Sequence, residues 1–277
     1  MWKWIPAKGR FGCILTGINT DKLEVGSFRE GKYMLQMTVW DKLLKVKWSF
    51  LNVYGAAQEE NKDEFLAELA RFCDTCKDPI LVGGDFNIIR FACEKNKNNG
   101  VHKHTDLFNS IIASQELVEI QMTGGRFTLS NNQEFPTLEK LDRDLVHKSW
   151  ESIFPTALVY KLPRELSDHN PLILTTQSNV PITKLSFKFE LTWLKDPNFL
   201  PTVQKLWNKP CFAKTPLDRV QAKLKRFKQH FKDWGFNRQG VLRKTKADMH
   251  DELLTLQTIE EDGLLSLEQI VRKSHLL

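Results

Sequence analysis

The sequence Ile80-Leu81-Val82-Gly83-Gly84-Asp85-Phe86-Asn87 places an acid and an amide directly after an apolar stretch. A short apolar run followed by glycines predicts a buried strand that ends where Asp85 begins the exit. Because residues two apart on an extended backbone point to the same side, Asp85 and Asn87 are expected to face one site. An acid after two glycines is also typical of an ordinary turn, so partners elsewhere in the chain must decide.

Three further positions carry suitable partners at the ends of predicted strands: Tyr54 before Gly55, Leu141-Asp142-Arg143, and Ser167-Asp168-His169. Metal-assisted hydrolysis of a phosphodiester needs hard oxygen ligands, a group that positions water, and stabilisation of developing charge. One of Asp85 and Asn87 can position the water while the other binds the phosphate. Asp168 is a candidate metal ligand. Asp142 is the candidate acid that keeps His169 protonated and fixes its tautomer, and the Tyr54 phenol could reach the phosphate.

Each residue also has an ordinary structural interpretation. Asp168 could cap a turn before His169-Asn170-Pro171, and His169 alone would more often be structural. Asp142 could pair with Arg143 on a surface strand, and Tyr54 could be edge packing. The joint occurrence of these residues, each at a strand terminus, favours a shared site.

Composition narrows the class of protein. The chain has 277 residues, 41% of them hydrophobic, and a net charge of +6. No apolar run approaches a membrane span, and the N-terminal sequence lacks the layout of a signal peptide. The positive charge favours nucleic acid as a partner. Five scattered cysteines indicate a reducing compartment rather than a disulfide framework; Cys73 and Cys76 are expected on a helix, with a zinc or redox role as the less favoured alternative.

The order of elements predicts a layered α/β (α+β) sandwich rather than a doubly wound sheet. Helices are expected over 62–76, with Asn61 as a possible cap, and over 107–117; residues 91–104 are expected to form an exposed loop. Strands are expected within 11–55 and over the following short segments: 33–39, 47–53, 80–82, 126–129, 140–146, 157–160 and 171–174.

The composition changes near residue 180, which predicts three parts: a domain over 1–178, a linker over 179–200 and a basic helical extension over 201–277. Val220, Leu224, Phe227, Phe231 and Trp234 step by four and three residues, as on one packed face of a helix. Gly235 is expected to end that helix, with a second helix over 238–259 completing a hairpin. The lysines on its other faces form either a solvated surface or a contact with nucleic acid.

These motifs together resemble the endonuclease/exonuclease/phosphatase superfamily, and most of all the endonuclease domain of plant LINE-type non-LTR retrotransposons. The likeness covers roughly residues 1–260 and rests on the following segments: Trp2-Lys3-Trp4-Ile5-Pro6, Gly9-Arg10-Phe11-Gly12, Asn52-Val53-Tyr54-Gly55, Gly83-Gly84-Asp85-Phe86-Asn87, Leu141-Asp142-Arg143, Ser167-Asp168-His169-Asn170-Pro171-Leu172 and Phe187-Lys188-Phe189-Glu190 with Trp193. The stretch after residue 200 is similar to the segment that joins endonuclease to reverse transcriptase in such elements.

The resemblance implies a four-layer sandwich of two packed mixed β-sheets flanked by helices, and Mg²⁺- or Mn²⁺-dependent nicking of DNA in the nucleus. Carried over by position, Asp85 activates water and Asn87 binds phosphate. His169, oriented by Asp142, stabilises the phosphorane-like charge. Asp168 belongs to the metal site, and Tyr54 contacts phosphate or leaving group.

Two departures from the family pattern qualify this expectation. Family members begin with two strands that carry an Asn and a metal-binding Glu, and the chain starts after both; Glu24 lies in a loop-like setting. Weak metal binding, impaired catalysis and an unpaired sheet edge are therefore expected. The chain also stops without a polymerase domain. The alternatives are a non-catalytic nucleic-acid-binding remnant, a domesticated fragment or a relic without function; a phosphatase activity is less favoured.

Overall fold

The protein forms two compact units, which we describe from a computed structural model. Met1–Asn179 together with Asp251–Leu277 make the first unit, and Val180–His250 make the second. The structure describes residues 1–7, 12–97, 103–176, 189, 191–211 and 215–277, and of residues 192 and 232–243 the backbone alone.

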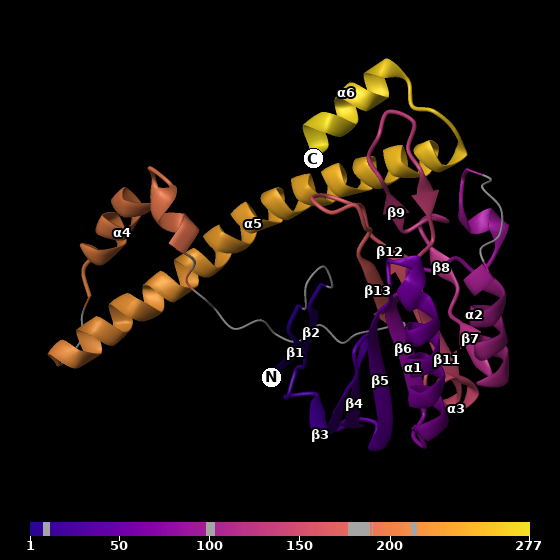
Figure 1. Cartoon of the computed structure of the whole chain (residues 1–277). Coiled ribbons are helices and arrows are strands. Elements are labelled where there is room, and N and C mark those ends of the chain that lie inside the picture. The colour runs from indigo at the N-terminus through magenta and orange to yellow at the C-terminus, as the bar shows by residue number, and fades with distance from the viewer. Residues whose placement is uncertain (8–11, 98–102, 177–188, 190, 212–214) are drawn as a thin grey trace. The chain divides into compact units, whose positions relative to one another are not determined.

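A six-stranded mixed sheet forms the centre of the first unit (Figure 1). Its strands, in spatial order, are β3 (Leu23–Glu30), β4 (Met34–Asp41), β5 (Val46–Tyr54), β6 (Ile80–Asp85), β11 (Asp142–His147) and β7 (Leu117–Glu119). Neighbouring strands are antiparallel except β5 and β6, which are parallel. The strands expected over 33–39, 47–53, 80–82 and 140–146 all lie in this sheet.

Smaller sheets complete the β structure. One has three strands: β13 (Leu172–Thr175), β12 (Leu158–Lys161) and β8 (Met122–Thr123). Two have two strands each: β1 (Trp2–Ile5) with β2 (Ile14–Gly17), and β9 (Leu129–Ser130) with β10 (Leu138–Glu139). The mixed α/β class with several packed mixed sheets is the one that the sequence predicts.

Alternation along the strands divides the central sheet into two buried faces. On one face, Val53, Val82 and Leu145 pack against α1 (Lys62–Thr75) and α2 (Lys103–Ser114). On the other face, Leu81 and Val146 pack with Trp150 of α3 (Lys148–Ile153) and with Leu174 of β13. The second face therefore lies between the two larger sheets, and it carries the side chains discussed below.

Some local predictions need correction. Glu24 does not lie in a loop: it is part of β3, opposite Trp40 of β4. Asn61, the last residue of the 3₁₀ helix η1 (Glu59–Asn61), stands at the start of α1 without a side-chain capping bond. The segment 91–104 is not all loop, because it contains the 3₁₀ helix η2 (Ala92–Glu94) and the first turn of α2.

The two cysteines expected on the first helix both lie against the core of the first unit. Cys73 lies in α1 and is buried in the core, and Cys76 follows the end of that helix, half-buried against the same core. Burial raises the pKa of the Cys73 thiol to about 12, which suits an inert core thiol.

The second unit has its own small aromatic core. It contains the 3₁₀ helix η3 (Leu191–Lys195), α4 (Phe199–Trp207) and the first part of α5 (Pro216–Asp262). Trp193, Phe199, Leu206 and Phe231 are buried together. Of the predicted apolar face, Phe227 and Phe231 reach this core, Val220 and Leu224 are exposed, and the Trp234 side chain lies outside the described residues.

The predicted helical hairpin is wrong, because α5 is continuous from Pro216 to Asp262 and includes Gly235 (Figure 1). A glycine inside a helix costs only about 1 kcal/mol relative to alanine, which flanking helical residues can offset. After α5 the chain continues into α6 (Leu267–Leu276), which begins at a Ser266 capping box. In the part of the chain that the structure describes, no helix combines the length and apolarity that a membrane crossing requires.

Candidate active site

Three predicted side chains lie in one row across the central sheet. Tyr54 is opposite Asp85 in the parallel β5–β6 register, and Asp85 is opposite Asp142 in the antiparallel β6–β11 register. Since β5 and β6 end where β11 begins, the row lies at one edge of the sheet. By strand alternation, the three side chains lie on the same face of the sheet as Leu81 and Val146, which is the face that packs against the second sheet.

Asn87 folds back onto the Asp85 carboxylate. Its backbone N–H donates to Asp85 Oδ1 at 2.9 Å, and its side-chain Nδ2 donates to Asp85 Oδ2 at 2.9 Å and to the Gly55 carbonyl at 3.1 Å. Asn87 has a left-handed backbone, with φ of 52°, so it reaches the same site through a turn rather than an extended segment. The amide thus orients Asp85 directly.

Two glycines allow this close approach of β5 and β6. Gly84 has φ of 140°, and a Cβ there would lie 2.1 Å from the Val53 carbonyl oxygen. A Cβ on Gly55 would lie 2.3 Å from the Phe86 carbonyl oxygen. The glycines next to Tyr54 and Asp85 are therefore required by the backbone that presents these side chains.

His169 is held by Asp142, as the sequence predicts. Its Nδ1 lies 2.7 Å from Asp142 Oδ2, and its Nε2 lies 4.0 Å from Asp85 Oδ2, beyond hydrogen-bonding distance. The three side chains are 27%, 17% and 12% exposed for His169, Asp142 and Asp85. Nε2 therefore points into a partly open site with a carboxylate on its far side.

Thr128 links the strand that carries Asp142 to the segment that carries His169, and the sequence did not reveal this role. Its hydroxyl oxygen accepts the backbone N–H groups of Leu141 and Asp142, each at 3.0 Å. Its carbonyl accepts the backbone N–H of Asn170 at 2.7 Å. Thr128 is fully buried, and it fixes the start of β11 relative to the His169 segment. A threonine in a short predicted strand gives no signal of this role.

The pKa values of His169 and Asp85 are both raised, but from different causes. The hydrogen bond to Asp142 raises the pKa of His169 to about 9, against the effect of burial and with help from the charges of Asp142, Asp85 and Asp168. Burial and the Asp142 charge raise the pKa of Asp85 to about 6, while His169 and the Asn87 hydrogen bonds oppose the rise. With these pKa values, at neutral pH the imidazole is protonated and the Asp85 carboxyl is mostly ionised.

Tyr54 and Asp168 complete the set. Burial raises the pKa of the Tyr54 phenol, and so do the negative charges of Asp85 and Asp168. The phenol therefore stays protonated and can donate a hydrogen bond. Asp168 accepts a long hydrogen bond from Ser167 Oγ at 3.4 Å. Strand register and hydrogen bonds bring together five of the predicted residues, Tyr54, Asp85, Asn87, Asp142 and His169, whereas Asp168 is exposed and adjoins His169 in the chain.

The donors fit Mg²⁺ only as a partial ligand set. Asp168 and Asp85 offer carboxylate oxygens, and Mg²⁺ is often held by one or two carboxylates together with waters and substrate phosphates. Within the described residues, no group of three or more His, Cys, Asp or Glu side chains could hold a metal ion by itself. A metal here would depend on the substrate for several of its ligands.

A cavity of about 530 Å³ adjoins the site between the two sheets. Asp142 and Asn170 line it on the site's side, and Trp48 and Leu174 give it apolar walls. Asp144 also lines it; burial, then the charges of Asp142 and Glu119, raise the pKa of this carboxyl to about 6. The cavity extends the site with a surface suited to an uncharged part of a ligand.

We expect the stability of the protein to fall as the pH rises from about 6.5 to 9. The folded-state pKa of His169, about 9, lies above its ordinary value of 6.5, so its stabilisation is complete below 6.5 and is lost as the pH passes through 9. Asp85 and Asp144, whose pKa values of about 6 are raised from 3.8, act in the same direction between about 4 and 6. Urea unfolding at pH 6, 7.5 and 9 measures the trend.

His169→Gln is the variant that isolates this effect. It should flatten the dependence between pH 6.5 and 9 while leaving the change between 4 and 6 in place. An identical pH dependence in the wild type and His169→Gln would contradict the assignment.

Comparisons with known proteins give remote structural likenesses alone. No protein-family model matches the sequence, and no curated protein matches it. The endonuclease domain of TRAS1, a telomere-specific non-LTR retrotransposon, is similar with a TM-score of 0.49 and 12% identity, over 62% of this chain and 78% of that one. A 3′-5′ exonuclease from Neisseria meningitidis is similar with a TM-score of 0.48 and 14% identity, over 63% of this chain and 79% of that one.

A third solved structure carries the family name that the motifs predict. It is an endonuclease/exonuclease/phosphatase family protein from Bacteroides thetaiotaomicron, with a TM-score of 0.38 and 16% identity over 62% of this chain and 74% of that one. The structures that this chain resembles include nucleases and phosphatases of that superfamily.

Proposed function

We propose that the chain is a metal-dependent phosphodiesterase of the DNA endonuclease type, with target-site nicking for a retrotransposon as its ancestral role. The observation that carries the proposal is the position of His169, whose Nδ1 lies 2.7 Å from Asp142 Oδ2 and whose Nε2 lies 4.0 Å from Asp85 Oδ2. A cation beside a carboxylate that titrates near neutral pH is what hydrolysis of a phosphodiester requires: one stabilises charge and the other takes a proton from water.

The remaining residues have proposed roles around the phosphate. Tyr54 donates a hydrogen bond to the phosphate or leaving oxygen. Asn87 has two side-chain N–H groups, and both are engaged by Gly55 and Asp85, so a phosphate contact from Asn87 requires its amide to turn. In this arrangement its first role is to orient Asp85.

Asp168 is the proposed ligand of Mg²⁺ or Mn²⁺. A bound divalent ion would neutralise charge on the non-bridging and leaving oxygens of the phosphate. Because the described residues offer only a partial ligand set, we propose weak metal binding and impaired turnover. A nuclear location, which the family resemblance implies, remains a prediction.

A nicking assay tests the proposal. We expect the wild type to convert supercoiled plasmid to nicked circle with Mg²⁺ or Mn²⁺ and not with EDTA. Asp85→Asn should lower the rate by roughly 100-fold or more, because the amide cannot take the proton. Equal rates for the wild type and Asp85→Asn, or nicking that persists in EDTA, would rule out this chemistry.

A second candidate is a non-catalytic module that binds nucleic acid. It is favoured by Arg219, Lys225 and Lys228, which are exposed on α5 of the second unit. Arg226 does not add to this surface, because its guanidinium donates to the carbonyl of Leu206 in the last turn of α4 and to those of Lys209 and Pro210 after it. Salt-dependent DNA binding that survives both EDTA and Asp85→Asn, without nicking, would support this candidate over the enzyme.

A further inference from the structure

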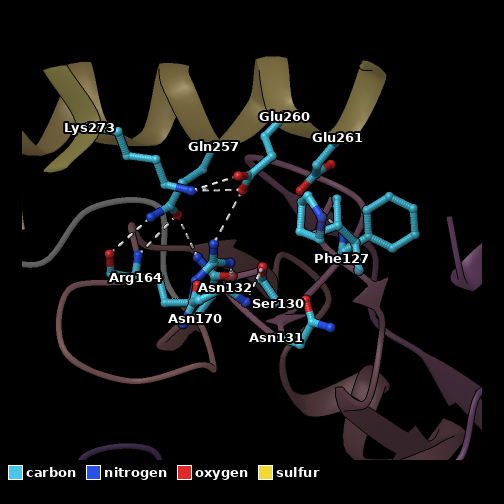
Figure 2. A network of polar contacts seen from close by, with 12 residues as sticks. Phe127, Ser130, Asn131, Asn132, Arg164, Asn170, Gln257, Glu260, Glu261 and Lys273 are labelled. Atoms are coloured by element: carbon cyan, nitrogen blue, oxygen red, sulfur yellow. Dashed lines mark hydrogen bonds and ion pairs between the residues drawn. The ribbon is translucent and has the colours of Figure 1, made fainter. Parts of the chain in front are cut away.

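The C-terminal part of α5 is joined to the first unit through a buried polar network (Figure 2). Gln257 lies at its centre and is 2% exposed. Its partners are Arg164 and Asn170, which are almost as deeply buried. Buried amides stay hydrogen-bonded because an unmet donor or acceptor costs about 1–3 kcal/mol, so this network specifies one arrangement of its members.

Gln257 pairs with the backbone of Arg164 in the way that one strand pairs with another. The backbone N–H of Arg164 donates to Gln257 Oε1 at 3.0 Å, and Gln257 Nε2 donates to the Arg164 carbonyl at 2.9 Å. Gln257 Oε1 also accepts from Asn170 Nδ2 at 3.0 Å. One side chain thus holds both ends of the segment 164–170, which carries Asp168 and His169 between them.

Asn170 connects the Gln257 contacts to the site through further hydrogen bonds. Its Oδ1 accepts from Arg164 Nη1 at 3.1 Å, and its Nδ2 also donates to the Leu162 carbonyl at 2.9 Å. Its backbone N–H donates to the carbonyl of Thr128, whose hydroxyl fixes the start of the Asp142 strand. The His169–Asp142 contact is therefore restrained from both sides by a chain of hydrogen bonds that begins at Gln257.

Ion pairs hold the helix itself in place. Lys161 pairs with Glu261 in a nearly fully buried contact, and Arg164 Nη2 lies 3.4 Å from Glu260 Oε2. Glu260 also binds Lys273 of α6 at 2.8 Å and 2.9 Å. Since these contacts anchor α5 without Gln257, the loss of Gln257 should release the segment 164–170 and leave the helix docked.

We propose that Gln257 is a positioning residue for the site, which keeps the Asp168–His169 segment in register with Asp142 and Asp85. The expected loss of nicking activity rests on the proposed function. The expected loosening of the segment rests on the hydrogen bonds alone. It also assigns Asp251–Asp262 of α5 to the machinery of the first unit, although this stretch lies more than eighty residues after His169 in the sequence.

Two measurements on Gln257→Leu test the proposal. We expect the backbone amide of Asn170 to exchange its hydrogen about tenfold faster or more, because its segment opens locally. We expect kcat for plasmid nicking to fall by about 10- to 100-fold with KM nearly unchanged, since misplaced groups lose transition-state rather than ground-state contacts. Amides of Met37 and Phe50, in the central sheet, should exchange as in the wild type.

Two matched controls accompany this variant. Thr258→Ala changes the next residue, which is exposed and whose hydroxyl donates to the Leu254 carbonyl of its own helix. Gln221→Leu removes the amide of an exposed glutamine from the same helix. Both should match the wild type in exchange and in kcat. If Gln257→Leu does not fold, Glu260→Gln replaces it in the test. This variant weakens the ion pairs next to Gln257 and should speed the exchange of the Asn170 amide and lower kcat, each by a smaller factor.

The outcomes separate this inference from the proposed function. Unchanged Asn170 exchange in folded Gln257→Leu overturns the positioning role, and so does faster exchange that is equal throughout the central sheet, which marks a global loss of stability. If the wild type itself does not nick DNA, the proposed function fails, and the exchange of Asn170 still decides the inference.

Discussion

Replacing His169 with alanine is expected to lower kcat for metal-dependent nicking by about 10²–10³-fold, the usual effect of removing one group that stabilises transition-state charge. The imidazole carries a proton at neutral pH because Asp142, 2.7 Å from Nδ1, stabilises the charged form. Alanine removes this cation and leaves Asp85 and Asp142 next to one another in adjacent strands with no charge between them. Single-turnover nicking of supercoiled plasmid at pH 7 measures the loss.

His147→Ala is the matched control for this experiment. His147 ends the same strand that begins at Asp142, about 17 Å away at about 3.4 Å per residue, and its side chain is 39% exposed. It should nick at the wild-type rate. If His169→Ala retains more than about a tenth of the wild-type kcat, the imidazole is not the main source of charge stabilisation.

The charge states also predict how the rate responds to pH in the wild type. Activity should rise as Asp85 loses its proton near pH 6 and fall as His169 loses its proton near pH 9, because both the carboxylate and the imidazolium are needed. This bell-shaped pH profile and the loss of rate in His169→Ala both follow from the need for a protonated His169. His169→Ala should lose the alkaline limb while the small remaining rate keeps the acid limb.

The sequence was most informative where chemistry and strand ends coincide. Asp85, Asp142 and His169 could be grouped because an acid, an acid and a histidine each follow or begin an apolar strand. The structure places Asp85 opposite Asp142 because β6 ends where antiparallel β11 begins, and it brings His169 to Asp142 through a bridge to Leu129 and the Nδ1 contact.

Contacts between distant segments could not be predicted in the same way. Gln257 is 87 residues from Asn170, and one polar residue in a long helix gives no sign of its partner. The continuity of α5 through Gly235 was missed because a helix-weakening residue was interpreted as a helix end. Local propensity of about 1 kcal/mol is too small to decide between a continuous and an interrupted helix when packing acts on both sides.

Arg143 is buried, although its charged side chain suggested a position on the surface. A pairing with Asp142 on a surface strand was one interpretation, but neighbouring strand residues point to opposite faces. Asp142 faces the site, whereas Arg143 is 2% exposed on the helix-covered face. There it binds Glu94 at 2.9 Å and Glu119 at 3.0 Å.

Arg143→Leu is expected to lower the free energy of unfolding by about 3–5 kcal/mol, because it removes the ion pair of buried Glu94 and leaves Glu119 with Arg90 and Lys140 as its cationic partners. Burial alone would raise the pKa of Glu119, yet the charges of Arg143 and Lys140 hold it down to about 2. The guanidinium also donates to the carbonyl of Lys140 at 2.8 Å, so the variant exposes an unmet backbone acceptor as well. Urea unfolding at pH 7 measures the change.

A double variant separates the loss of a partner from the loss of packing. Glu94→Leu combined with Arg143→Leu removes both members of the closest pair, so it should cost clearly less than the sum of the two single changes. Arg126→Leu is the control, since Arg126 is 60% exposed in its ion pair with Asp262 and should change stability by no more than about 1 kcal/mol. If Arg143→Leu costs no more than Arg126→Leu, the buried network does not depend on Arg143. The strand that presents Asp142 would then be held in place chiefly by its apolar neighbours, Leu145 and Val146.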